Sequence, residues 1–250
     1  MVLQEADNEL TIDCLLLAGR IMIEGGAETY RVEDTMLRMA KSQNMTDAQC
    51  YATPTGIIFS LGKTQPTRIT SISKRVTDLQ KIALVNSVSR RLTSHMITLE
   101  EAYDELKSIQ KTNYFLPTYL QVIAAALASG CFLIMFQGEW SDFPIACLAG
   151  GLGFLMLIIT NHLTKVKFFS EFTASLVIGL IAFFAEKYGY STEIDKIIIS
   201  SVMPLVPGIL ITNAVRDLMA GHFMSGMAKG AEAFLTAFAI GAAIAVTLGF

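Results

Sequence analysis

Charged residues are scarce in the second part of this 250-residue sequence. Of its 41 Asp, Glu, Lys and Arg residues, 27 lie within residues 1–115 and only 14 are spread over the other 135. That second region consists of apolar runs separated by short polar loops, and runs of roughly 18 to 20 apolar residues can cross a membrane as helices. The sequence therefore predicts a small α+β domain over 1–115 and an all-α bundle of about five transmembrane helices over 116–250, with spans at 116–138, 143–163, 170–186, 196–214 and 232–250.

Several signatures of enzymes and of nucleic-acid-binding proteins are also missing. The net charge is −3 and no block of basic residues occurs, so we expect no nucleic-acid partner. The four cysteines show no C-x-x-C spacing, the histidines are isolated and no G-x-S-x-G motif is present, so we expect no disulfide, metal, other cofactor or catalytic site. Gly62-Lys63-Thr64 resembles the end of a phosphate-binding loop, but Ile57 stands where that motif needs a glycine. Any transport would therefore use an ion gradient instead of ATP.

The N-terminus, MVLQEADNELTIDC, is acidic and lacks the basic flank and apolar core of a signal peptide. We therefore expect the domain over 1–115 to lie in the cytosol. The inner loops then hold Lys165, Lys167, Arg216 and Lys229, and the outer loops hold Lys187 and Lys196. This modest positive-inside bias agrees with a cytosolic start. The prediction is a multi-pass protein of the cell membrane, with its N-terminus in the cytosol and its C-terminus outside.

Within the first domain, apolar periodicity and turn residues predict helices at 8–24, 27–42, 78–94 and 99–111, and strands at 48–53, 55–61 and 67–73. Gly25 and Gly26 end the first helix as a C-terminal cap. The segments Thr77–Gln80 and Thr98–Glu101 both have the sequence of a capping box at a helix start. The predicted order is α-α-β-β-β-α-α.

Polar residues are dense in the segment from Gly26 to Asp34, which includes Thr29 and Glu33. On a helix, one face of this region would carry Glu28, Arg31, Thr35 and Arg38. One interpretation is a solvated face held by weak ion pairs. The other is a polar face that docks the domain onto cytosolic loops or binds substrate.

The fourth predicted span contains Pro204 and Pro207 followed by Gly208, which should break the helix within the membrane. A broken helix is tolerated where its freed backbone groups are buried or line a cavity, and many secondary transporters hold anions at such breaks. The alternative is a simple kink. After the break, one helical face carries Asn213, Arg216 and Asp217, although the last two also fit an ordinary interfacial ion pair.

Two carboxylates lie at the predicted start of a span: Glu171 in the third and Glu232 in the fifth. Each is either a helix N-terminal charge stabilised by the helix dipole or, inside a bundle, a proton carrier. The fifth span also carries a small residue at every fourth position, a stripe typical of close helix packing: Ala237, Gly241, Ala245 and Gly249. Because five spans rarely enclose a pathway alone, this stripe favours a partner subunit and an oligomer.

Three segments of the chain resemble the threonine/serine exporter family: GGAETYRVEDTM at 25–36, ATPTGI at 52–57, and PLVPGILITNAVRDLMAGHFMSGMAKGAEAF at 204–234. The similarity continues through Lys74–Val76 and Val85–Asn86, so it covers most of the chain. Full-length members of the family fuse a cytosolic domain to about ten spans. With five predicted spans, this chain resembles the N-terminal half of a split, two-protein system.

The resemblance implies export of threonine or serine driven by the proton gradient, with a second five-span membrane protein completing the transporter. It favours Pro207, Gly208, Asn213, Arg216, Asp217 and Glu232 as residues of the pathway. One split pair in the family is linked to succinate, so a dicarboxylate exporter subunit is the alternative. A membrane-anchored cytosolic hydrolase-like enzyme and a regulatory subunit that does not transport remain open.

Overall fold

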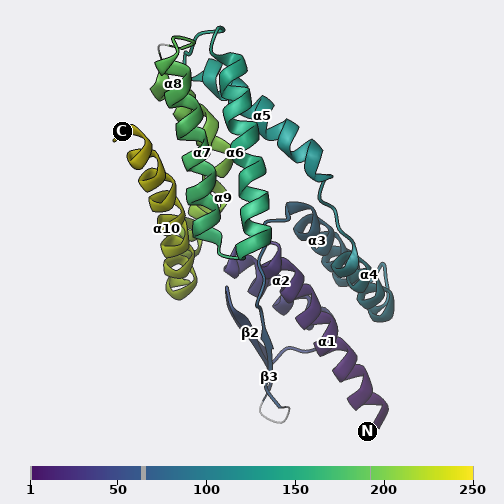
Figure 1. Cartoon of the computed structure of the whole chain (residues 1–250). Helices are drawn as coiled ribbons and strands as arrows, with labels where there is room; N and C mark the ends of the chain where they lie inside the picture. Colours follow the sequence, from purple (N-terminus) through teal and green to yellow (C-terminus); the bar gives the residue numbers. More distant parts are fainter. Residues whose placement is uncertain (1, 63–65, 192, 250) are drawn as a thin grey trace. The chain divides into compact units, whose positions relative to one another are not determined.

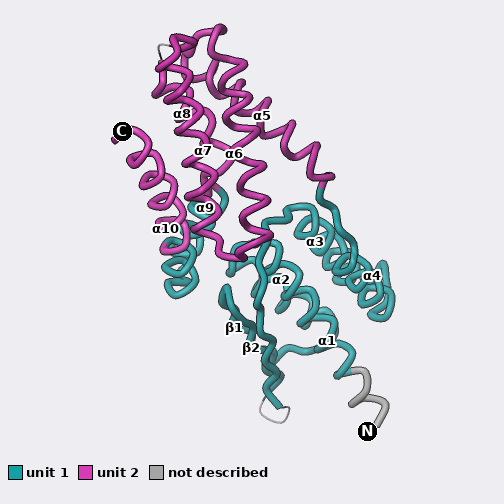
Figure 2. Tube along the Cα trace, in the orientation of Figure 1, with its two compact units in different colours: residues 1–115, 209–230 teal, residues 116–208, 231–250 magenta. Residues whose placement is uncertain are grey.

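The computed structural model describes residues 2–62, 66–191 and 193–249. Lys63 and Thr64, from the segment that resembles a phosphate-binding loop, lie outside the described residues, as does Phe250 at the C-terminus. The chain forms two compact units (Figure 2). Unit 1 comprises residues 1–115 and 209–230, and unit 2 comprises 116–208 and 231–250. The predicted boundary after residue 115 coincides with a boundary between the units, but residues 209–230 group with the N-terminal region.

Unit 1 contains the predicted α+β arrangement (Figure 1). Its helices α1 (Val2–Glu24) and α2 (Thr29–Ser42) precede the strands β1 (Ala48–Thr53), β2 (Gly56–Leu61) and β3 (Arg68–Ser71), and α3 (Leu79–Thr93) and α4 (Leu99–Lys111) follow. The three strands form an antiparallel sheet in the order β1-β2-β3. Large side chains from α1, α2 and β2 fill the core, among them Leu15, Met22, Met36, Ile57 and Phe59.

Local sequence signals set the ends of these helices. Helix α1 ends in the two-glycine turn, where Gly26 has a φ of +87°, a conformation that residues with a side chain rarely adopt. The capping box of Thr98 and Glu101 is present at the start of α4. The capping box predicted at Thr77 is wrong, because α3 is capped instead by Asp78, whose side chain accepts a hydrogen bond from Lys81 N.

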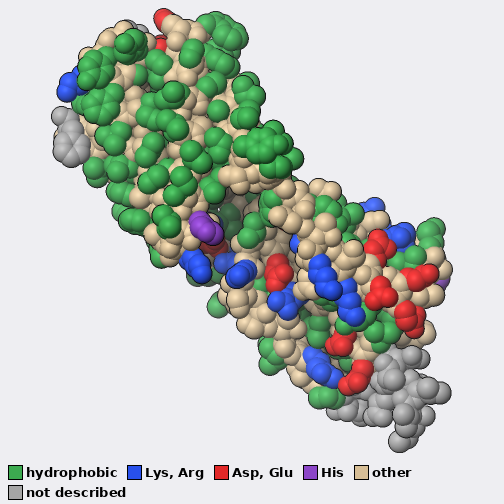
Figure 3. Space-filling model, turned by 45° about the vertical axis from the view of Figure 1, so that its right-hand side comes forward, with side chains coloured by type: hydrophobic (Ala, Val, Ile, Leu, Met, Phe, Trp, Pro, Cys, Tyr) green, Lys and Arg blue, Asp and Glu red, His purple; other side chains and the backbone are tan. Residues whose placement is uncertain are grey.

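Unit 2 is helical and contains α5 (Thr118–Met135), α6 (Phe143–Thr164), α7 (Lys167–Lys187) and α8 (Ile194–Val202). Helix α10 (Phe223–Leu248) begins in unit 1 and continues into unit 2 after Gly230. Among the described residues, four helices, α5, α6, α7 and α10, are long and apolar enough to cross a membrane. Figure 3 shows hydrophobic side chains over the visible face of unit 2 and clustered charges on unit 1. The chain is therefore a multi-pass membrane protein.

The predicted break in the fourth span is confirmed. After α8 the chain forms a short 3₁₀ helix, η1 (Met203–Leu205), and α9 (Gly208–Met219) begins beyond it. Val206, which precedes Pro207, has an extended conformation with ψ of 129°. Proline disfavours the helical conformation of the residue before it and removes its own N–H donor, so the helix cannot continue through this point. The two helical pieces, α8 with η1 and α9, add one span to the other four only if they cross the membrane together.

Candidate functional site

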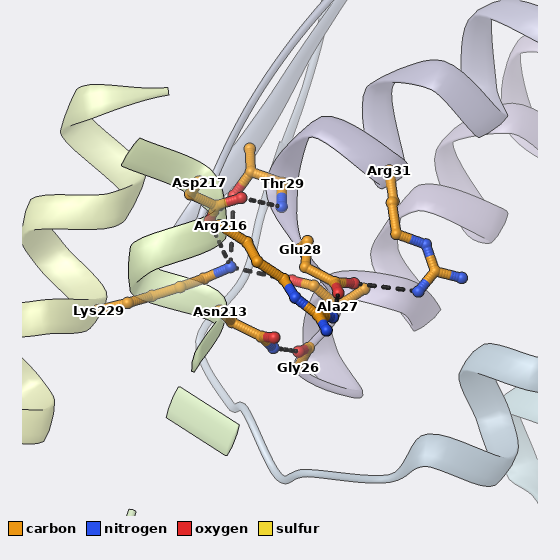
Figure 4. A network of polar contacts seen from close by, with 9 residues as sticks. All are labelled: Gly26, Ala27, Glu28, Thr29, Arg31, Asn213, Arg216, Asp217 and Lys229. Atoms are coloured by element: carbon orange, nitrogen blue, oxygen red, sulfur yellow. Dashed lines mark hydrogen bonds and ion pairs between the residues drawn. The ribbon is translucent and has the colours of Figure 1, made fainter. Parts of the chain in front are cut away.

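A network of polar contacts joins the turn between α1 and α2 to α9 and the first turns of α10, all within unit 1 (Figure 4). The two-glycine turn leaves Gly26, Ala27 and Glu28 outside helices, so their backbone carbonyls are not all used in helical hydrogen bonds. Helix α9 presents its polar face to this turn. The network thus brings the polar segment after Gly26 together with the charged residues that follow the broken helix.

Asp217 forms the buried centre of this network. Its side chain is fully buried, and its two oxygens accept hydrogen bonds from Thr29 N at 2.9 Å and from Thr29 Oγ1 at 3.0 Å. Lys229 Nζ lies 2.8 Å from Asp217 Oδ2 and also donates to Ala27 O at 2.9 Å. Buried charges need both a counter-charge and hydrogen bonds. Asp217 has both, so the cost of burying its charge is offset by these contacts.

Two further contacts attach the turn to α9. Asn213 Nδ2 donates to Gly26 O at 2.8 Å, and Arg216 Nη1 donates to Glu28 Oε1 at 2.6 Å. Arg31 Nη1 binds the other oxygen of Glu28 at 3.2 Å. Arg216 and Asp217 therefore do not form the ordinary ion pair that was the alternative. Arg216 pairs with Glu28, and Asp217 pairs with Lys229.

Glu28 is 4% exposed. Burial alone would raise the pKa of its carboxyl, but a hydrogen bond to its own backbone N–H, the hydrogen bond from Arg216 and the charges of Arg31 and Arg216 together lower that pKa. Arg216 itself is different, because 55% of its side chain is exposed. A guanidinium has five N–H donors. Arg216 therefore keeps donors available to a further anion while it binds Glu28.

The predicted polar face of α2 divides into a buried part and a solvated part. Glu28 and Thr35 are buried, whereas Arg38 forms an exposed ion pair with Asp34 at 2.6 Å. Glu33 turns towards the sheet, where its Oε1 accepts a hydrogen bond from Ala52 N at 2.8 Å. Glu28 and Thr29 thus dock against α9, whereas Arg38 lies on a solvated face.

Lys229 also belongs to this network, although the sequence predicted only that it lies in an inner loop. It is nearly buried, although lysine is rarely buried without a partner. Its distance of 12 positions from Asp217 matches no helical spacing, so no pattern in the sequence links the two. The feature of the sequence that could have indicated burial of Lys229 is its place at the end of the apolar stretch Gly-Met-Ala-Lys.

Unit 2 holds the other predicted carboxylates. Glu232 does not open a helix as predicted, because α10 starts nine residues earlier at Phe223; it pairs instead with Lys167 Nζ at 2.8 Å. Glu171 lies in the second turn of α7 and is 6% exposed. The Thr236 hydroxyl lies beside it, yet Glu171 Oε2 and Thr236 Oγ1 both lack a hydrogen-bond partner among the described residues.

Ser175, one helical turn after Glu171 on α7, is a third buried side chain whose oxygen has no hydrogen-bond partner in the described part of the chain. Buried polar groups in proteins are normally hydrogen-bonded, and more strictly so in a membrane. No group of three or more His, Cys, Asp or Glu side chains suited to a metal ion occurs among the residues with described positions.

Comparisons with known proteins agree with this architecture. A family described as "ThrE: Putative threonine/serine exporter" matches residues 13–250. A protein of Escherichia coli named "Probable succinate transporter subunit YjjP" is 24% identical over 98% of this chain and 95% of its own length. The "Probable threonine/serine exporter" of Mycobacterium tuberculosis is 22% identical over 90% of this chain, which spans 44% of that protein. No solved structure shows significant similarity. The chain belongs to the ThrE family of threonine/serine exporters.

Proposed function

We propose that the chain is one subunit of a secondary-active exporter of small carboxylate-bearing metabolites, with threonine and serine as the first candidates and the proton gradient as the driving force. The observation that carries the proposal is the proline-interrupted helix, which leads directly into the polar face of α9. Transporters commonly use such interrupted helices to expose backbone groups to a substrate. We further propose that residues 1–115 lie in the cytosol and that the C-terminus lies outside.

The proposed substrate site lies at the break. The backbone N–H groups at the start of α9, next to Pro207 and Gly208, form a helix N-terminus that favours an anion. Pro204 lies in the 3₁₀ turn before it. Arg216, with its exposed guanidinium further along α9, is a separate proposed contact for the substrate on the pathway. Asn213 positions this helix by its bond to Gly26 O.

Glu171 is the proposed carrier of the coupling proton. The other two candidates, Asp217 and Glu232, each contact a lysine, at 2.8 Å in both cases. Glu171 is buried and has one oxygen without a hydrogen-bond partner among the described residues. A carboxyl group that exchanges a proton during each cycle has to be satisfied in both states, and it cannot be fixed permanently by a lysine.

A second membrane subunit is proposed to pack on α10. The small residues of the predicted stripe are exposed on this helix, and a Cβ added at Gly241 would meet nothing within 4 Å. Large apolar side chains flank them, since Phe234 and Phe238 are 68% and 65% exposed. Small residues allow close helix approach in a membrane. Gly241→Leu should therefore reduce co-purification of the partner subunit, and unchanged co-purification would remove this face from the proposed interface.

The succinate alternative has its own support, because the relative covered over 95% of its length is named as a succinate transporter subunit. The test is uptake of labelled threonine into everted membrane vesicles that contain the chain and its co-expressed partner, with a proton gradient imposed. Gradient-dependent threonine uptake that unlabelled succinate does not inhibit would support the first substrate class. Accumulation of succinate without threonine would support the second, and uptake of neither would contradict the transport proposal.

A further inference from the structure

A cavity of about 190 Å³ lies in unit 1, apart from the polar network around Asp217. Its wall combines the last turn of α1, the segment before α3, the first turn of α3 and the end of α4. Apolar side chains on one side include Ile21, Val76 and Phe115, and charged side chains on the other include Lys74 and Asp78. Such a mixture of apolar surface and a few polar groups is typical of a small-molecule site.

Asp78 is the most unusual part of this wall. Its Oδ1 caps α3 by accepting a hydrogen bond from Lys81 N at 3.0 Å. Its Oδ2 is buried and has no hydrogen-bond partner among the described residues, although the whole residue is only 8% exposed. A buried carboxylate oxygen without a donor is costly, so its presence on a cavity wall indicates a missing donor.

One of the two lysines on the cavity wall also has no partner among the described residues. Lys74 is exposed and forms no ion pair or hydrogen bond within the described parts of the chain. Lys81, by contrast, is held by its hydrogen bond to Gln110 O at 2.9 Å. The cavity therefore offers one free acceptor with a negative charge, on Asp78, and an ammonium group without a partner, on Lys74, while Lys81 keeps two further N–H donors.

The size of the cavity limits its ligand. A volume of 190 Å³ is small beside the roughly 300 to 1,000 Å³ of pockets that hold drug-sized ligands, so the cavity fits only a small molecule. A dicarboxylate of this size would place negative charge against Asp78 and against Glu24, which also lines the wall. A molecule with one ammonium and one carboxylate matches both free groups.

We propose that this cavity binds a small α-amino acid, with its ammonium group on Asp78 and its carboxylate on Lys74. The site lies outside the proposed transport route and does not depend on it. Its wall includes Gly25, directly before the Gly26–Thr29 turn, and Phe115, three residues before α5 begins. Binding would order both segments, so the cytosolic domain would sense its ligand and act on the chain that leads into the first span.

The test is hydrogen exchange of the full-length chain in detergent, with serine, threonine or succinate added. Serine or threonine should slow exchange in residues 20–25, 74–82 and 110–115. Asp78→Asn keeps a good helix cap but removes the charge, and Lys74→Gln alters an exposed side chain, so both should fold. Each should weaken amino-acid binding by about tenfold or more, the loss expected for one charged hydrogen bond.

The control variant is Asp34→Asn, which changes an exposed carboxylate away from the cavity and should leave the protection unchanged. Unfolding temperatures of all three variants show whether each has kept its fold. Three results would overturn the proposal: no protection of these segments by either amino acid, equal protection by succinate, or unchanged affinity in a folded Asp78→Asn variant.

Discussion

Among the buried carboxylates, Asp217 in unit 1 and Glu171 in unit 2 have opposite surroundings. Asp217 in unit 1 receives three hydrogen bonds, from Thr29 N, Thr29 Oγ1 and Lys229 Nζ. Glu171 in unit 2 lies beside the Thr236 hydroxyl, near the charges of Lys167 and Glu232, and keeps one oxygen without a hydrogen-bond partner among the described residues. Hydrogen bonds and a counter-charge fix a buried carboxylate in one place, whereas a carboxylate with an unbonded oxygen can accept a new donor. The comparison separates Asp217, which stabilises the structure, from Glu171, which is suited to a change of partner in a transport cycle.

The largest effect on stability should come from removing the cation of the fully bonded pair. Lys229→Met leaves Asp217 buried without its counter-charge, so the free energy of unfolding should fall by about 3 to 5 kcal/mol. Denaturant unfolding in detergent measures this change. Lys41→Met, on the exposed surface of α2, is the matched control and should have little effect.

The double variant Asp217→Asn/Lys229→Met sharpens this result. It leaves no unpaired charge, so it should be more stable than Lys229→Met alone. A loss below about 1 kcal/mol for Lys229→Met would contradict the view that this ion pair fixes α9 and α10 to the turn between α1 and α2.

Arg216 and Arg31 form a matched pair, because both bind Glu28 and both are partly exposed. Replacement of either with Gln should cost about 1 kcal/mol of stability or less, since solvent screens such pairs. Transport should distinguish them. Arg216→Gln should raise the KM for the substrate, whereas Arg31→Gln should leave it unchanged. Equal KM values in vesicle uptake would remove Arg216 from the substrate site.

The smallest effect should appear only in acid. The lowered pKa of Glu28 means that folding favours its ionised form, so its stabilising contribution is complete above its ordinary pKa of 4.5 and is lost as the pH falls through the lowered value. Unfolding measured between pH 7 and pH 3 should show a steeper loss below pH 4.5 in the native chain than in Glu28→Gln. Identical slopes in the two proteins would contradict the assignment.

Local features of the fold were predictable from the sequence. The strands β1 and β2 lie almost at their predicted positions, because Pro54, Gly56 and Gly62 mark their turns. The proline break was equally clear, since a missing N–H acts at one position whatever surrounds it. Glu232 was misplaced, because the residues from Phe223 to Gly230 already form helix before it.

The candidate site was only partly predictable. The sequence identified Glu28, Thr29, Arg216 and Asp217 as residues of interest, but not as partners. Thr29 and Asp217 are 188 positions apart, and no local periodicity reports a contact over that distance. Residues 209–230 group with the N-terminal unit, and these long-range bonds join the two segments. Hydropathy assigns those residues to the membrane domain because it counts apolar side chains and ignores what the polar ones bind.

The most direct test of the contrast between the two carboxylates compares net accumulation with exchange in everted vesicles that contain the chain and its partner. Glu171→Gln resembles the protonated carboxyl permanently, so we predict loss of gradient-driven accumulation while exchange of labelled for unlabelled substrate continues. Glu186→Gln, which changes an exposed carboxylate near the end of the same helix, should retain gradient dependence. Gradient-driven accumulation by Glu171→Gln at the native level would contradict the account.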